Sequence, residues 1–183
     1  MRVITGTARG RKLGQLQGME TRPTTDQVKE SIFNIIQFDI EGRRVLDLFG
    51  GTGQLGIEAL SRGAESCTFV DQRRDAVNLI RSNLKLCQLS DRARVVQGDS
   101  IGFLSTVREK YHLIFLDPPY ATNLLENALK KIAEVDILSE NGIIICERPV
   151  EKALADDFPG LTHWCDYIYG KTAVTIFRKA QRA

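Results

Sequence analysis

The sequence is poor in the residues that build metal and disulfide sites. Only two of its 183 residues are histidines, His112 and His163, and they stand far apart. None of the four cysteines forms a CxxC pair, and most of them fall inside apolar runs (Cys67, Cys87, Cys146 and Cys165). We therefore expect no metal centre and no disulfide, and we predict small core cysteines in a reducing compartment.

Long apolar stretches are also missing. No run approaches the roughly 18 residues that span a bilayer, and the opening Met-Arg-Val-Ile-Thr-Gly lacks the apolar core of a signal peptide. We predict a cytoplasmic protein with no membrane partner. The net charge is only +2. A nucleic acid, if it is the partner, must therefore meet a local concentration of positive charge.

The most informative stretch runs from His112 to Tyr120 and reads His-Leu-Ile-Phe-Leu-Asp-Pro-Pro-Tyr. Its apolar part is typical of a parallel strand that is buried on both faces, and the prolines must end that strand because they cannot donate to a ladder. Asp117, Pro118, Pro119 and Tyr120 then present a carboxylate, fixed carbonyl groups and a flat ring. This set suits the amino group of a nucleobase with the ring stacked on the base, although a simple proline turn has the same residues.

A second motif joins a strand to a helix through glycines. Residues 43–49 form an expected strand, Gly50-Gly51-Thr52-Gly53 form a tight loop, and residues 54–62 form an expected helix closed by Gly63. Glycines let a backbone approach a ligand, and a helix amino terminus favours negative charge. The loop lacks the Gly-Lys-Ser/Thr of a P-loop, and the Gly-x-Gly-x-x-Gly spacing of Gly51, Gly53 and Gly56 is by itself a weak signal.

Acids end four successive predicted strands. They are Asp47, Asp71 after residues 66–71, Asp99 near the end of residues 95–100, and Asp117. Because open α/β sheets bind ligands at the carboxyl ends of their strands, the four acids together predict an adenosine cofactor beside an amino-group site. Asp71 is expected to bind the ribose. Asp99 can accept from adenine or cap the helix that begins near Ser100, and both interpretations stay open.

The first 24 residues differ in composition from the rest. They contain Glu20 as their only acid and five basic residues, Arg2, Arg9, Arg11, Lys12 and Arg22. We predict a small hairpin or irregular arm that contacts RNA phosphates, the alternative being an ordinary solvated terminus. Thr24 and Gln27 match a capping box for a helix over about residues 25–38. The segment 21–24 before it can bind a carboxylate or phosphate, or only cap the helix.

The rest of the chain completes an α/β sheet. Residues 124–133 have helical spacing, residues 142–146 form an apolar strand, and residues 164–169 and 172–177 form an expected hairpin around Gly170-Lys171. We predict residues 25–183 to be a single domain, preceded by the basic arm of residues 1–24. A domain of this size buries roughly 70% of the surface of its unfolded chain.

These motifs resemble a known family. Asp47-Leu-Phe-Gly-Gly-Thr-Gly is similar to motif I of class I S-adenosylmethionine-dependent methyltransferases, and Asp117-Pro-Pro-Tyr is similar to motif IV of their amino-methylating branch. The opening Arg-Val-Ile-Thr-Gly, the run Arg9 to Leu13, Thr21-Arg-Pro-Thr-Thr and the Phe33-Asn-Ile helix resemble the bacterial 16S rRNA guanine-N2 methyltransferases called RsmD. The likeness covers nearly the whole chain. Gly50, where many relatives have alanine, and Asp71, where glutamate is common, are conservative departures.

The resemblance implies a Rossmann-like fold with a mostly parallel seven-stranded sheet and a carboxy-terminal antiparallel hairpin. It implies S-adenosylmethionine as cofactor and, as partner, 16S rRNA within an assembled or assembling small ribosomal subunit, with the enzyme a monomer. Asp117, Pro118, Pro119 and Tyr120 would hold the guanine amine and its base. The cofactor would contact Asp47, Phe49, Gly50, Gly51, Gly53, Asp71, Gln72, Asp99 and Ser100, with Thr24 and Thr25 closing over it.

Three other functions remain open from the sequence. A DNA or protein amino methyltransferase shares Asp-Pro-Pro-Tyr, but the chain has no large target-recognition insertion. An NAD-dependent oxidoreductase would use the same sheet and leave Asp117 to Tyr120 without a purpose. A non-enzymatic RNA-binding module would need only the basic arm.

Overall fold

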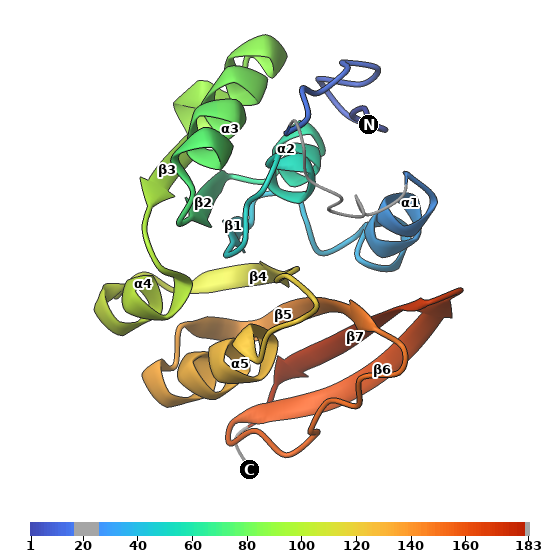
Figure 1. Ribbon diagram of the computed structural model, residues 1–183, viewed down its shortest axis with the longest axis vertical. Coiled ribbons are helices and arrows are strands. Elements are labelled where there is room, and N and C mark those ends of the chain that lie inside the picture. The colour runs from blue at the N-terminus through green and yellow to red at the C-terminus, as the bar shows by residue number, and fades with distance from the viewer. Residues whose placement is uncertain (17–25, 182–183) are drawn as a thin grey trace.

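The computed structural model describes residues 1–16 and 26–181, which form one seven-stranded sheet with helices on both faces (Figure 1). The strands are β1 (Arg44–Asp47), β2 (Ser66–Asp71), β3 (Ala93–Gln97), β4 (Tyr111–Leu116), β5 (Leu138–Pro149), β6 (Leu161–Tyr169) and β7 (Thr172–Lys179). The helices are α1 (Asp26–Ile35), α2 (Gln54–Ser61), α3 (Arg74–Cys87), α4 (Ser100–Thr106) and α5 (Leu124–Val135), with a 3-10 turn at Ser90–Arg92.

The order of the strands in the sheet is β3-β2-β1-β4-β5-β7-β6. The first five strands are parallel, and β7 lies antiparallel between β5 and β6. This confirms the predicted mostly parallel sheet with a carboxy-terminal antiparallel hairpin. The chain moves outward from β1 to β3 and then returns to start β4 on the other side of β1. The loops after β1 and β4 therefore meet where the strand order reverses, which is the usual ligand site of such sheets.

The apolar runs of the central strands are continuous because helices cover both faces of the sheet. Along β4, Leu113 and Phe115 belong to one buried cluster, whereas Ile114 and Leu116 belong to the other. The first cluster includes side chains of α1, α2 and α3, and the second includes those of α4 and α5. Burial on both faces is what the pattern from His112 onward predicts.

The observed elements differ from the predicted ones mainly at their ends. Helix α1 ends at Ile35, and the turn that follows it leaves Phe38 91% exposed. Strand β3 ends at Gln97, short of its predicted end, because Gly98 and Asp99 turn the chain into α4. Strands β5, β6 and β7 are longer than predicted because pairing continues beyond their most apolar residues.

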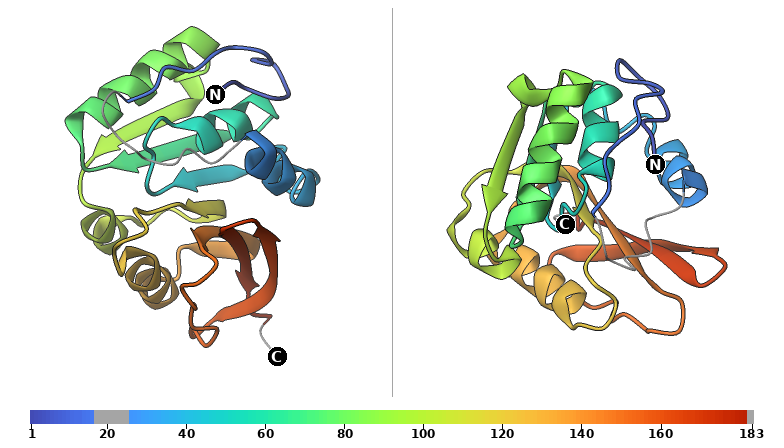
Figure 2. Two further views of the ribbon diagram at one scale, coloured as in Figure 1. Left: turned by 45° about the vertical axis from the view of Figure 1, so that its right-hand side comes forward. Right: turned by 45° about the horizontal axis from the view of Figure 1, so that its top comes forward.

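The amino-terminal segment lies beside α2 in both Figure 1 and Figure 2. An isolated antiparallel bridge joins Arg2 to Lys12, and the Val3 N–H donates to the Arg11 carbonyl (3.0 Å). Apolar side chains of the segment enter the cluster beneath α1 and α2: Val3, Ala8 and Leu13. Residues 1–16 of the arm therefore form a compact fold-back that is packed onto the rest of the molecule.

In the described ranges 1–16 and 26–181, no helix is both long enough and apolar enough to cross a membrane. The same residues contain no group of three or more His, Cys, Asp or Glu side chains placed to hold a metal ion. The four cysteines are free thiols, and three of them are buried.

Candidate active site

The loop between β1 and α2 turns on two glycines in the left-handed backbone region. The angle φ is 56° at Gly51 and 80° at Gly53, values that glycine adopts without steric cost. The Gly50 N–H donates to the Val70 carbonyl of β2 (2.9 Å), and the Gly53 N–H donates to the Gly50 carbonyl (2.7 Å). Because Gly53 immediately precedes α2, the loop ends at the positive end of that helix.

Gly56 and Asp47 hold this loop against the sheet. A Cβ atom at Gly56 would lie 2.3 Å from the Phe69 ring, so a larger residue would push α2 away from β2. The Gly56 N–H donates to Asp47 Oδ2 (3.2 Å), and Asp47 is only 2% exposed. Burial raises the pKa of the Asp47 carboxyl to about 7, with the Gly56 N–H opposing the rise and the Asp71 carboxylate adding to it. Asp47 thus supports the loop from beneath.

Asp71, the last residue of β2, ties the glycine loop to the start of α3. Its Oδ2 accepts the Gly51 N–H (2.9 Å) and its Oδ1 accepts the Arg73 N–H (2.9 Å). An ionised carboxylate has about four acceptor positions. The two backbone bonds therefore orient Asp71 and still leave it capacity to bind a pair of ribose hydroxyls.

The strand register shows that the four predicted acids do not lie at the same level along the sheet. Asp47 pairs with Phe69 on β2 and with Phe115 on β4, so Asp71 and Asp117 each lie two residues nearer the carboxyl edge of the sheet. Asp71 is level with Gln97, which places Asp99 two residues further out. The stagger explains why Asp47 is buried while the other three acids are at least partly exposed.

Asp99 is the cap of α4. Its Oδ2 accepts the Gly102 N–H (2.7 Å) three residues ahead, which is the usual bond of an N-cap acid. Ser100, the next residue, is buried. Of the two interpretations that the sequence left open for Asp99, the structure thus displays the cap, and the carboxylate lies exposed at the same edge of the sheet.

Strand β4 ends at Leu116 and delivers the Asp-Pro-Pro-Tyr loop beside the glycine loop. Asp117 is half-buried and Pro118 is buried. The Pro119 carbonyl accepts both the N–H (3.3 Å) and the hydroxyl (2.8 Å) of Thr122, so it is committed to the turn. The Asp117 carboxylate and the Pro118 carbonyl are then the candidate acceptors for a ligand amine. The Tyr120 hydroxyl donates to Glu147 Oε1 on β5 (2.9 Å).

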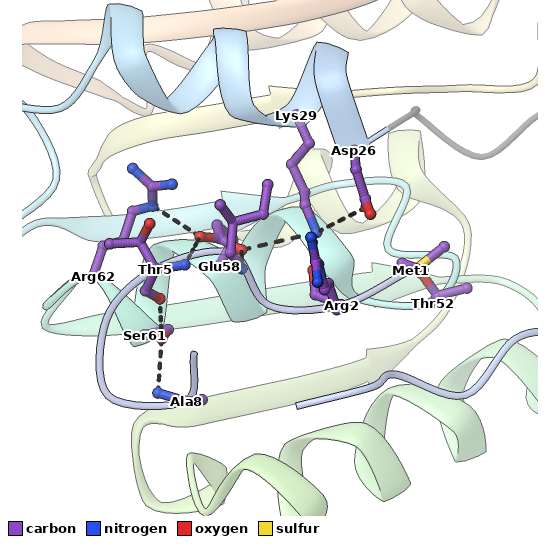
Figure 3. A network of polar contacts seen from close by, with 11 residues as sticks. Met1, Arg2, Thr5, Ala8, Asp26, Lys29, Thr52, Glu58, Ser61 and Arg62 are labelled. Carbon is purple, nitrogen blue, oxygen red and sulfur yellow. Dashed lines mark hydrogen bonds and ion pairs between the residues drawn. The ribbon is translucent and has the colours of Figure 1, made fainter. Parts of the chain in front are cut away.

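A buried ion-pair network attaches the arm to this site (Figure 3). Glu58 of α2 is fully buried, and its carboxylate accepts the Ile4 N–H (2.8 Å), the Thr5 N–H (2.9 Å) and Arg62 Nε (2.9 Å). The Lys29 ammonium of α1 is also fully buried, 3.8 Å from Glu58 Oε2. Burial lowers the pKa of Lys29, and the Glu58 carboxylate opposes that shift.

A second set of contacts joins the arm directly to the glycine loop. The buried Asn83 side chain of α3 accepts the Gly14 N–H (2.8 Å) and donates to the Thr52 carbonyl (2.9 Å). The Thr52 hydroxyl also contacts Met1 Sδ (3.3 Å; Figure 3). No sequence pattern predicted a role for Asn83, Glu58 or Lys29. Glu58 carried one signal, because it is the only charged residue in the helix Gln-Leu-Gly-Ile-Glu-Ala-Leu-Ser.

The other predicted site residues fall into three groups. Phe49 is partly buried and Gln72 is exposed at the same edge of the sheet. Four predicted RNA contacts are exposed on the arm: Arg2, Arg9, Arg11 and Lys12. The remaining three, Arg22, Thr24 and Thr25, lie outside the described residues.

Comparisons with known proteins agree with this arrangement. A family model described as "Conserved hypothetical protein 95" matches residues 1–178. The Bacillus subtilis protein named "Putative rRNA methyltransferase YlbH" is 44% identical over 182 residues, covering 98% of this chain and 99% of the relative. "Ribosomal RNA small subunit methyltransferase D" of Haemophilus influenzae is 38% identical over 157 residues, covering 84% of this chain and 81% of its own.

A solved structure has the same fold over almost the full length. "Putative methyltransferase yhhF from Escherichia coli" superposes with a TM-score of 0.88 at 32% sequence identity, covering 98% of this chain and 97% of that one.

Proposed function

The chain belongs to the RsmD/YlbH family of rRNA methyltransferases, and from this premise we propose that it methylates the N2 amine of a guanine in 16S rRNA. Its fold is the class I S-adenosylmethionine-dependent methyltransferase fold, as the sequence predicted. We propose that it acts in the cytoplasm as a monomer, with residues 1–24 as its basic arm and residues 25–183 as its methyltransferase domain. The small ribosomal subunit, assembled or assembling, is the proposed substrate.

One observation carries this proposal. The Asp117-Pro-Pro-Tyr loop and the glycine loop follow neighbouring parallel strands at the point where the strand order reverses. An acceptor-rich loop therefore stands beside a loop built to receive a ligand at a helix amino terminus. The juxtaposition suits a reaction that transfers a group from a bound cofactor to an amine.

The glycine loop fits S-adenosylmethionine. Gly51 and Gly53 supply backbone without side chains, and Asp71 is oriented with spare acceptor capacity. We assign Asp71 to the ribose hydroxyls and the glycine loop, with Phe49 and Gly50, to the methionine end. Asp99, Ser100 and Gln72 are assigned to the adenine side, Asp47 to support of the loop, and Thr24 and Thr25 to closure over the methionine.

The proposed chemistry is mostly positioning. S-adenosylmethionine supplies a methyl group that is already electrophilic because it is bonded to a positively charged sulfur. The Asp117 carboxylate and the Pro118 carbonyl accept the two N–H bonds of the amine, and this turns the nitrogen lone pair toward the methyl carbon. The same acceptors would stabilise the positive charge that develops on nitrogen as the nitrogen–carbon bond forms and the methyl–sulfur bond breaks, while Tyr120 stacks on the extruded base. The proton that the methylated amine then loses would pass to the Asp117 carboxylate or to water.

RNA binding is assigned to the arm. Arg2, Arg9, Arg11 and Lys12 are exposed on a segment that is fixed to α2, so their charges are held in one arrangement. Fixed positive charges suit contacts to phosphates, which depend strongly on salt. Arg22 is proposed to extend the same surface.

The test is to incubate the protein with methyl-labelled S-adenosylmethionine and small ribosomal subunits that lack the modification, and then to identify the labelled nucleoside. We expect label in N2-methylguanosine. Asp117→Ala should lower transfer by about 100-fold or more while cofactor affinity stays within about twofold. Absence of label with cofactor bound would move the proposal to DNA or protein amines. Absence of cofactor binding would overturn it.

A further inference from the structure

A shallow hollow lies behind the Asp-Pro-Pro-Tyr loop. Its walls come from that loop, the start of α5, the end of β5 and the segment that follows β5; they include Pro118, Tyr120, Glu147, Arg148 and Lys152. Tyr120 is the aromatic side chain among its lining residues, and the proposed function stacks this ring on the target base.

The Tyr120 ring is held from β5, although the residue itself lies in a loop. Its hydroxyl donates to Glu147 Oε1 on β5 (2.9 Å). Burial, and then the Glu147 carboxylate, raises the pKa of Tyr120 above its usual range. The hydroxyl therefore remains a donor at physiological pH.

Glu147 is an unusual residue for its place. The four residues before it in β5, Ile143 to Cys146, are buried and apolar, and Glu147 is itself only 4% exposed. The next residue, Arg148, directs its guanidinium to Thr175, to Asp166 and to the carbonyls of Pro149 and Lys152. A buried carboxylate is costly unless it is hydrogen-bonded, and an apolar residue would complete the strand at no such cost.

Resting on the proposed function, we infer that Glu147 is a positioning residue for methyl transfer and that it acts through Tyr120. The bond from the Tyr120 hydroxyl fixes the ring before the substrate arrives. When the ring is already fixed, stacking of the base does not have to restrict the motion of the Tyr120 side chain. The entropic cost of that restriction is then avoided, so a larger share of the stacking energy is available for binding and alignment. Loss of the bond would leave the ring in place but free to rotate.

The test is a double-mutant cycle. Tyr120→Phe removes the donor and keeps the ring, and Glu147→Met removes the acceptor without leaving a large cavity. Each change should lower kcat/KM for the small ribosomal subunit by about 10- to 100-fold, as expected for a hydrogen bond to a charged group. The kcat/KM of the double variant should be no lower than that of the more impaired single variant, because both changes break the same Tyr120–Glu147 bond. The dissociation constant for S-adenosylmethionine should stay within about twofold.

Two further variants keep the inference open to refutation. Glu147→Gln retains an acceptor for the Tyr120 hydroxyl and should recover kcat/KM to within about threefold of wild type, which decides the matter even if Glu147→Met does not fold. Glu134→Met makes the same chemical change at an exposed position of α5 and should have no effect.

Multiplicative losses in the double variant would overturn the inference, as would a Glu147→Gln variant as impaired as Glu147→Met. Loss of cofactor affinity in parallel would mean that Glu147 is merely structural. A wild-type protein that transfers no methyl group would instead overturn the proposed function, and this inference with it.

Discussion

Replacing Glu58 by alanine removes the acceptor at the centre of the network that attaches the arm. Three donors lose their partner at once: the N–H groups of Ile4 and Thr5 and the Arg62 side chain. Among the residues that the structure describes, the buried Lys29 ammonium then keeps the Arg2 carbonyl and the distant Asp26 carboxylate (4.0 Å). Breaking a buried pair by removing one partner costs about 3–5 kcal/mol because the other charge stays buried.

We therefore expect Glu58→Ala to lower the free energy of unfolding by about 4 kcal/mol. A domain of this size loses about 2–4 °C of Tm per kcal/mol, so the midpoint should fall by about 8–16 °C. Lys29→Met should cost much less, about 1–2 kcal/mol, because Glu58 then still has Arg62 and two backbone N–H partners. The distinctive result is that Glu58→Ala should lower the free energy of unfolding more than Lys29→Met does.

Thermal and urea unfolding of the two variants would measure these differences, with Glu30→Ala on the exposed side of α1 as the control. The control should change stability by less than about 0.5 kcal/mol. Brief trypsin digestion provides a local readout, since the arm contains exposed cleavage sites at Arg9 and Arg11. We expect faster cleavage there in Glu58→Ala. A Lys29→Met variant that is less stable than Glu58→Ala would refute the reasoning.

Three further predictions follow from single features. As the pH rises from 5 to 8, Asp47→Asn should become more stable relative to wild type by about 3 kcal/mol, as measured by urea titration. The pKa of the native Asp47 carboxyl is raised to about 7, so its contribution to the stability of the wild type is lost as the pH rises through that value. An equal difference in stability between variant and wild type at both pH values would count against this prediction. Asp136 has a pKa lowered to about 2 by hydrogen bonds from Lys110 and Lys179, so its contribution is present above about pH 4 and lost as pH falls through 2. Asp136→Asn should cost under about 1 kcal/mol at pH 6, because the side chain is half-exposed, and progressively less as the pH falls below 4. Changing Arg9, Arg11 and Lys12 together to alanine should reduce the slope of log kcat/KM against log salt by about 2–3, and an unchanged slope would exclude the arm from phosphate contact.

The topology was predictable because local patterns carried it. Apolar runs that end in Asp47, Asp71 and Asp117 are parallel strands in the structure, and the glycine loop joins strand to helix where expected. The ends of elements were less predictable. Ile36 is buried at helical spacing from Ile32 and still lies beyond α1, because burial does not require the helix to continue. The periodicity of apolar residues predicts which residues are buried. Where a helix or strand ends depends instead on its last backbone hydrogen bond, and therefore on the segments packed around it.

The candidate site was predictable in its residue types and less so in their roles. Asp47 and Asp71 both end predicted strands, yet one lies beneath the loop and the other at the edge. A shift of two residues in register makes this difference, and register depends on which strands pair. Asp99 illustrates the same limit, because a cap and a ligand contact require the same residue at the same place.

The attachment of the arm lay beyond sequence reasoning for a simpler reason. Glu58 accepts from residues 53 and 54 positions away, and Asn83 bonds a residue 69 positions away. No local pattern carries such contacts. These contacts nevertheless connect two parts of the proposed site, because the Asn83 side chain hydrogen-bonds both the arm at Gly14 and the glycine loop at Thr52. A basic segment attached in this way does not act as a loose tether. It presents its charges in a fixed relation to the glycine loop, so the proposed RNA surface and the proposed cofactor site are parts of one rigid unit.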